Sequence, residues 1–192
     1  MLLTTHFTHQ IASLFTAAGL ALAITASPAS GRCFNMESPP PGATYPVGFS
    51  LALPDVTISI DEFQYSGGGW AGPAHDANIV VSNEALGSAV QEIMVDNCTI
   101  VFEPDPPAKA ARFRYADLGG NTNFEINGDF RNVADLSMLD GFIVGGHLVT
   151  VVWVSGLGFE RGILTVHPAG PPIDLLRVGG QEFFLDDLCY RR

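Results

Sequence analysis

The amino-acid sequence predicts an all-β protein: an antiparallel β-sandwich of the jelly-roll kind that follows an N-terminal signal peptide. Short runs of alternating apolar and polar residues recur along the chain, which is the pattern of half-buried strands. The 21 Gly and 13 Pro are spread between these runs and are typical of a chain with many turns. Helical periods of about 10–15 residues, which an α/β fold needs between its strands, are absent from the sequence.

Residues 1–31 have the features of an export signal. They contain no Asp, Glu, Lys or Arg, and an apolar run from Ile11 to Ile24 is followed by small residues. This arrangement is typical of a secretory signal peptide, and the run is shorter than a membrane span of roughly 20 residues. We therefore expect a signal peptide over 1–31 and a single β-sandwich domain over 32–192. The mature chain should have no membrane span and a secreted or periplasmic location.

The strands are predicted from alternation and from β-branched residues. The strongest is His147–Val154, which is rich in valine. The segment 121–130 is either one long strand or a hairpin that turns at Asn127-Gly128. The segment 132–139 is either one helical turn or an irregular bridge. In chain order the predicted strands are Cys33–Met36, Val56–Ile60, Ile79–Ser82, Ile93–Val95, Cys98–Phe102, Arg112–Tyr115, Asn121–Phe130, Phe142–Val144, His147–Val154, Ile163–His167, Ile173–Arg177 and Glu182–Leu188.

The charge balance narrows the choice of partners. The chain has 9 Lys+Arg against 20 Asp+Glu, a formal net charge of −11. A surface this acidic repels the phosphate backbone of nucleic acids and the headgroups of anionic lipids. We therefore exclude nucleic acid as a partner and expect an extracellular polysaccharide or a cell-surface ligand.

Three cysteines remain in the mature chain. Cys33 opens it and Cys189 nearly closes it, so the two can form a disulfide if the first and last strands are neighbours. Cys98 is then left without a partner. Its ordinary role would be that of a small buried apolar side chain.

Five polar residues occupy alternate positions in the segment 121–130: Asn121, Asn123, Glu125, Asn127 and Asp129. In one extended strand their side chains share a face about 13 Å long, enough for two or three sugar rings. Amide and carboxylate groups in such a row can exchange hydrogen bonds with sugar hydroxyls, which makes the first four candidate ligand contacts. The alternatives are an ordinary solvent-facing row, or a row that the Asn127-Gly128 turn breaks.

If the protein is an enzyme, the candidate catalytic residues are Glu125, Asp129 and His147. Glycoside hydrolysis needs two carboxyl groups about 5–10 Å apart, and four residues along a straight strand span about 13 Å. The pair therefore requires a fold-back. Among the aromatic residues, Trp70 lies in a Gly-rich loop and is the candidate for stacking on a sugar ring. Trp153 lies in the Val-rich strand and is expected in the core.

Acidic residues lie near both ends of the mature chain. Glu37 follows the first predicted strand, and Asp186 and Asp187 lie within the last. If those strands are neighbours, the three carboxylates converge, and a bound cation would offset their repulsion. Calcium prefers six to eight oxygen ligands of this kind, so a structural calcium is expected at these residues. The alternative is that Asp186 and Asp187 are an ordinary pair with one side chain in solvent.

Residues 33–37 (Cys-Phe-Asn-Met-Glu) and 184–189 (Phe-Leu-Asp-Asp-Leu-Cys) resemble the ends of a group of secreted bacterial β-sandwich proteins. The segments 119–130 and 179–182 are similar to the same group. More broadly, the layout is similar to calcium-stabilised jelly-roll carbohydrate-binding modules, in which acids of the first and last strands often hold the ion. The resemblance implies a fold and no settled activity.

Three functions are consistent with these patterns. The leading one is a secreted, non-catalytic β-sandwich that binds extracellular polysaccharide or another surface ligand and contains a structural calcium. The second is a secreted hydrolase or lyase that acts on polysaccharide, since jelly rolls host both kinds of protein. The third is an envelope or matrix protein that works by self-association, which an exposed edge strand and a free Cys98 would favour.

Overall fold

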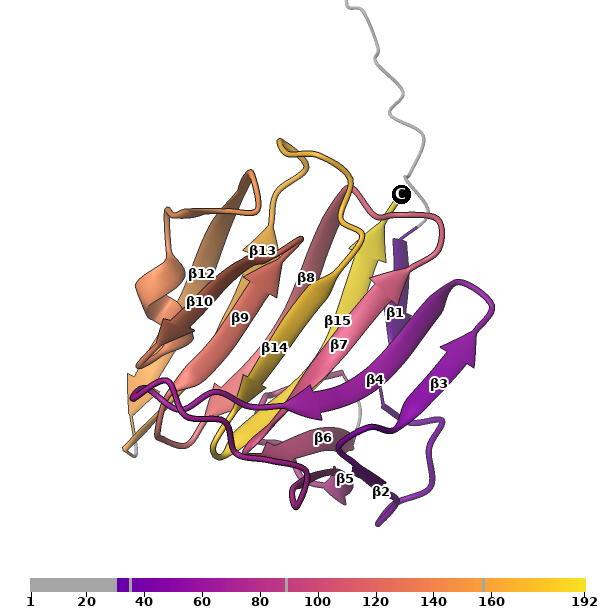
Figure 1. Ribbon diagram of the computed structural model, residues 1–192, viewed down its shortest axis with the longest axis vertical. Coiled ribbons are helices and arrows are strands. Elements are labelled where there is room, and N and C mark those ends of the chain that lie inside the picture. The colour runs from indigo at the N-terminus through magenta and orange to yellow at the C-terminus, as the bar shows by residue number, and fades with distance from the viewer. Residues whose placement is uncertain (1–30, 35, 89, 157) are drawn as a thin grey trace, which may run out of the picture.

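The computed structural model describes residues 31–34, 36–88, 90–156 and 158–192. The predicted signal peptide lies outside the described residues except for Gly31. The chain is an all-β sandwich of two antiparallel sheets stacked face to face, which confirms the predicted fold class (Figure 1). No helix within the described segments has the length and hydropathy of a membrane span.

The larger sheet, sheet A, has nine strands. They are β1 (Gly31–Phe34), β2 (Thr44–Pro46), β5 (Asp76–Val81), β6 (Gln91–Asp96), β8 (Ala110–Asp117), β11 (Ile143–Val144), β12 (His147–Gly156), β13 (Phe159–Val166) and β15 (Phe183–Arg191). Their order is β11-β12-β13-β8-β15-β6-β5-β2, and β1 pairs with β15.

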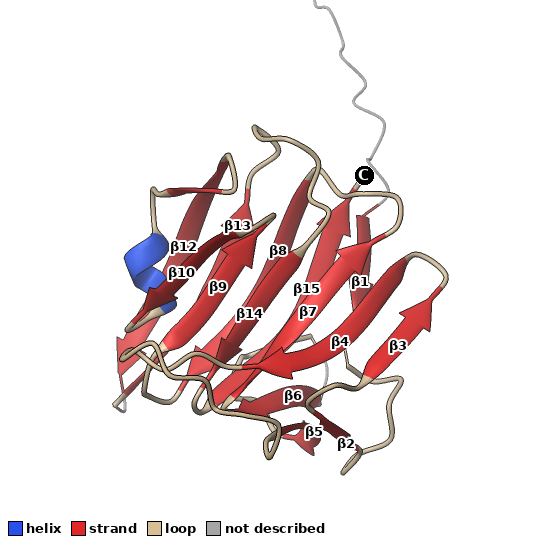
Figure 2. Cartoon of the chain, viewed as in Figure 1, coloured by secondary structure: helices blue, strands red, loops and turns tan. Residues whose placement is uncertain are grey.

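The smaller sheet, sheet B, has six strands. They are β3 (Ser50–Leu53), β4 (Val56–Glu62), β7 (Cys98–Pro104), β9 (Thr122–Ile126), β10 (Asp129–Val133) and β14 (Leu176–Gly180), in the order β10-β9-β14-β7-β4-β3. A single 3-10 turn, η1 (Leu136–Leu139), is the helical element drawn in Figure 2. It corresponds to the helical turn that the sequence offered as one alternative for residues 132–139.

The core lies between the two sheets and is built by alternation. Phe113 and Tyr115 of β8 and Phe183 of β15 are buried on the inner face of sheet A, and Phe124 of β9 faces them from sheet B. The rings of Tyr115 and Phe183 stack with centroids 5.9 Å apart. Because side chains alternate along a strand, the neighbours of these residues point away from the core.

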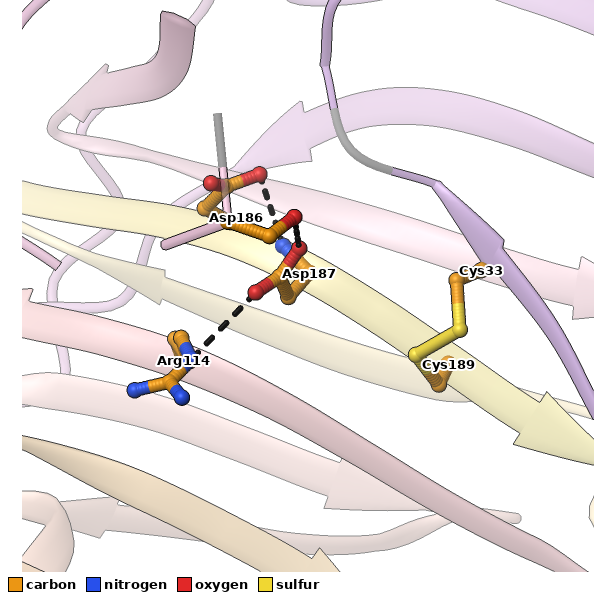
Figure 3. Close-up of a disulfide and its surroundings, with 6 residues drawn as sticks. Cys33, Arg114, Asp186, Asp187 and Cys189 are labelled. Carbon is orange, nitrogen blue, oxygen red and sulfur yellow. Dashed lines mark hydrogen bonds and ion pairs between the residues drawn. A yellow bond between two sulfur atoms is a disulfide. The ribbon is translucent and has the colours of Figure 1, made fainter. Parts of the chain in front are cut away.

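The first and last described strands meet in sheet A, which is the arrangement that the predicted disulfide requires. β1 pairs with β15 in a register that places Cys33 opposite Cys189, and the two form a disulfide (Figure 3). β15 pairs with β6 over its first residues and with β1 over its last, and its register with β8 shifts between Asp186 and Cys189. Asp187 has a φ of 50° there, as is common at a β-bulge.

Three local predictions concern the segment 121–130, Trp153 and Cys98. Asn127 and Gly128 both have positive φ, so β9 and β10 form a hairpin and not one long strand. Trp153 was expected in the core, but its side chain is 43% exposed near the edge of sheet A. Cys98 is buried, as its ordinary role predicts, and burial raises the pKa of its thiol to about 12.

Candidate functional site

The most prominent polar and aromatic site lies on the outer face of sheet B, where the chain after β4 forms a small hairpin, Phe63–Ala71. The Ala71 amide donates to the Phe63 carbonyl at 2.9 Å, and the Tyr65 amide donates to the Gly69 carbonyl at 2.8 Å. Gln64 and Trp70 form an antiparallel bridge between its two arms. We call this segment the Trp70 hairpin. It crosses in front of β14 and β9 (Figure 1).

The tip of the Trp70 hairpin explains why Trp70 is accessible. Gly67, Gly68 and Gly69 have no heavy atoms of other residues near the position that a Cβ would take, so the turn projects into open space. Gly68 has a φ of 83°, which side-chain-bearing residues adopt at a cost. Trp70 follows this turn and its side chain is 53% exposed. At the base of the hairpin, Phe63 is buried and packs edge-on against Tyr65.

Three asparagines fix the hairpin to sheet B through the backbone of Gln64. Asn123 accepts from the Gln64 amide at 2.7 Å through Oδ1 and donates to its carbonyl at 2.9 Å through Nδ2, much as a neighbouring strand would. Asn121 and Asn132 donate to the same carbonyl at 3.0 and 2.7 Å. Buried backbone groups outside a ladder need such partners, so this asparagine clamp makes the hairpin a positioned element.

The asparagines of the predicted polar row bond to other parts of the chain and do not form a continuous solvent-facing row. Asn123 does lie on the outer face of β9, and Asn121 directly precedes that strand, but both are buried beneath the hairpin, and Asn123 is only 1% exposed. Asn127 lies in the β9–β10 turn, where its side chain bonds the chain at Pro172, Asp174 and Leu175. The row is broken at Asn127, which was the alternative that the Asn-Gly pair offered.

Glu125 belongs to an ion-pair array across sheet B. Arg177 of β14 pairs with Asp61 of β4 on one side and with Glu125 at 3.4 Å on the other. Burial raises the pKa of Glu125 and lowers that of Arg177. The carboxylate of Glu125 thus already has a cationic partner.

The three candidate catalytic residues are not brought together. Glu125 lies opposite Phe130 and Asp129 lies opposite Ile126, so the two acids point to opposite faces of the β9–β10 hairpin. Asp129 pairs with Arg131 and accepts from the Gly145 amide. His147 is buried in sheet A, and its Nδ1 lies 2.8 Å from the His167 carbonyl.

The three predicted calcium ligands, Glu37, Asp186 and Asp187, each bond to different groups of the chain. Glu37 accepts from the amides of Val90 and Gln91. Asp187 accepts from Ser88 and pairs with Arg114 at 3.2 Å (Figure 3). Among the residues that the structure describes, no group of three or more His, Cys, Asp and Glu side chains is placed to hold a metal ion, so the calcium site stays a prediction.

Asp186 is fully buried beside these residues. One carboxylate oxygen accepts from the Asp187 amide, and the other, Oδ2, has no hydrogen-bond partner within the described residues. Burial, followed by the charges of Asp187, Glu92 and Glu37, raises the pKa of Asp186 to about 6. Glu92, also buried, accepts from Ser82, Glu84 and Ala85 and so fixes the loop that leads into β6.

Asp117 is a further buried acid, and it was not anticipated from the sequence. Asp117, at the end of β8, accepts from Thr122 at 2.6 Å and from the Gly119 amide. Burial raises its pKa to about 6. Glu160 lies opposite it on β13 and accepts from the Tyr115 hydroxyl. The two bonds that Asp117 accepts fix the β8–β9 connection and so position Asn121 in the asparagine clamp.

Sequence reasoning also missed Gln64 and Asn132, although a signal for Asn132 was present. A two-residue turn at Asn127-Gly128 places Asn132 directly opposite Asn123, so three amides converge on one face. Nothing local in the sequence marks Gln64 as their partner.

Comparison with protein-family models, with curated proteins and with solved structures finds no match for this chain.

Proposed function

We propose that the protein is a secreted, non-catalytic binding protein for extracellular polysaccharide and that Trp70 is its principal contact. The observation that carries the proposal is a half-exposed tryptophan on a turn fixed to a rigid sheet. Aromatic faces bind the apolar faces of sugar rings, and an exposed indole presents such a face to solvent. The acidic surface and the disulfide between the chain ends are consistent with an extracellular role.

The asparagine clamp supports the proposal because it lowers the cost of binding. A loop that must be ordered when the ligand arrives loses affinity, whereas a loop that is already fixed does not. Partly buried side-chain bonds to Gln64 from Asn121, Asn123 and Asn132 supply this preorganisation. A binding role is favoured over hydrolysis because Glu125 and Asp129 lie on opposite faces and each has an arginine partner.

Replacing Trp70 should weaken binding selectively. The purified protein is incubated with cellulose, chitin or insoluble xylan, and both protein depletion and soluble product are measured. We expect depletion without product on at least one polymer, and an affinity about tenfold or more lower for Trp70→Ala, because a central aromatic contact carries much of the binding energy. The matched control is Trp153→Ala, which removes the other tryptophan. Equal affinities of the two variants, or release of product, would count against the proposal.

One observation favours self-association as a second candidate function. β11 pairs only with the first two residues of β12, so from Val152 onward the edge of β12 has no neighbouring strand within the described residues. Val152 is 73% exposed, and Phe142 and Ile143 are exposed nearby. The segment His147–Gly156 has no Asp, Glu, Lys or Arg. An open, apolar, uncharged edge is a template for pairing with another strand.

The second candidate predicts oligomers that depend on concentration. Sedimentation velocity over a range of protein concentrations would detect them, and Val152→Lys should return the protein to monomer because a charge at the edge opposes strand pairing. Val81→Lys is the control, since Val81 is a similarly exposed valine on β5. A monomer at all concentrations would rule out this route. Cys98 gives no support for covalent oligomers because it is buried.

A further inference from the structure

A pocket on the outer face of sheet A is separate from the Trp70 hairpin. Because Phe113 and Tyr115 of β8 point into the core, Arg112 and Arg114 point to the opposite side, away from sheet B. The pocket has a volume of about 370 Å³. It is lined by Cys33, Ser88, Arg112, Phe113, Arg114, Asp187 and Cys189. That volume lies within the range of about 300–1,000 Å³ that is common for small-molecule sites.

Arg112 is unusual among the cationic side chains of this acidic protein. The chain has nine Lys and Arg residues. Six of them form ion pairs: Arg32, Arg114, Arg131, Arg161, Arg177 and Arg192. The other three are Lys109, Arg112 and Arg191, and of these only Arg112 lines this pocket. Within the described part of the chain, no carboxylate pairs with its exposed guanidinium.

The other charges in the pocket are already matched. Arg114 donates through Nε to Asp187 at 3.2 Å, and Ser88 donates to the second oxygen of the same carboxylate (Figure 3). The carboxylate of Asp187 therefore has two donors. The charges of Arg114 and Asp187 offset each other, so the guanidinium of Arg112 gives the pocket lining one excess positive charge. The disulfide between Cys33 and Cys189 forms a covalently fixed wall beside it.

We propose that this pocket binds a carboxylate group, carried either by a free sugar acid or by a uronic acid residue of a polymer. The planar guanidinium fork matches a carboxylate and can donate two parallel hydrogen bonds to it. Arg114 already pairs with the carboxylate of Asp187 in the same pocket, through a single contact from Nε. The site lies on the opposite layer of the sandwich from Trp70, so it is independent of the function proposed above.

Calorimetric titration of the purified protein with trigalacturonate, galacturonate and neutral maltotriose tests the proposal. We expect trigalacturonate to bind and maltotriose to bind at least tenfold more weakly. Equal affinity for monomer and trimer would identify a free sugar acid as the ligand, and tighter binding of the trimer would identify a polymer.

Arg112→Gln should weaken trigalacturonate binding about tenfold or more, because a charge-assisted pair is lost. Lys109→Gln removes the same charge from an exposed residue outside the pocket and should change affinity less than twofold. Equal weakening by Arg112→Gln and Lys109→Gln, or no binding of either acid, would overturn the proposal.

Discussion

Loss of the Cys33–Cys189 disulfide should lower the free energy of unfolding by about 3–5 kcal/mol. The bond joins residues 156 positions apart, so it closes a long loop and lowers the conformational entropy of the unfolded chain. For a domain of this size, that corresponds to a fall of about 10 °C in Tm. The disulfide also fixes β1, whose one strand partner among the described residues is β15, so β1 should become the first strand to detach.

Urea unfolding of the double variant Cys33→Ser/Cys189→Ser measures this effect. The control is a reducing agent, which should lower the stability of the native protein to that of the variant and leave the variant unchanged. This comparison separates loss of the bond from the two side-chain changes. A native protein that resists urea equally well with and without reductant, once reduction is confirmed by thiol titration, would contradict the prediction.

Asp117 and Asp186 should make the protein more stable as the pH falls from 7 to 5. Burial raises the pKa of each carboxyl from 3.8 to about 6 in the folded state. Between these values the folded chain binds protons that the unfolded chain does not, so the free energy of unfolding rises as the pH falls. Each group should contribute about 1 kcal/mol over this interval. The same gain is lost as the pH rises through 6.

The variants Asp117→Asn and Asp186→Asn isolate each carboxyl from other groups that titrate in the same interval. The difference in unfolding free energy between the native protein and each variant should grow by about 1 kcal/mol on going from pH 7 to pH 5. Asp129→Asn is the control, since the Gly145 amide and Arg131 lower the pKa of Asp129 below its usual value and its carboxyl stays ionised in both states over this interval, so its difference should not change. Differences that do not change with pH at Asp117 and Asp186 would refute this account.

Features that depend on a local sequence pattern could be predicted from the sequence. Features that depend on contacts between distant residues could not. Alternation located most strands, and the positions of Cys33 and Cys189 predicted the disulfide on the condition that the first and last strands are neighbours, as β1 and β15 are. The exposure of Trp153 was not predicted. β11 is only two residues long and leaves the edge of β12 uncovered near Trp153, and the valine content of the strand does not reveal this.

The candidate site shows the same limit. Trp70 was found because a tryptophan among glycines is locally conspicuous. The partner of Asn123 was not, because Gln64 is 59 residues away and is recognised through its backbone, which any residue type possesses. The pocket at Arg112 also escaped notice, since it needs β1, β8 and β15 side by side.

The central claim is that Trp70 on its clamped hairpin contacts polysaccharide, and the two-tryptophan composition allows a direct measurement. Fluorescence is recorded for Trp153→Phe, which retains only Trp70, and for Trp70→Phe, which retains only Trp153, during titration with soluble oligosaccharides of the polymer that depletes the protein. We expect a blue shift and a change in intensity for Trp153→Phe and none for Trp70→Phe. A response confined to Trp70→Phe, or binding with no change in the emission of Trp70, would contradict it.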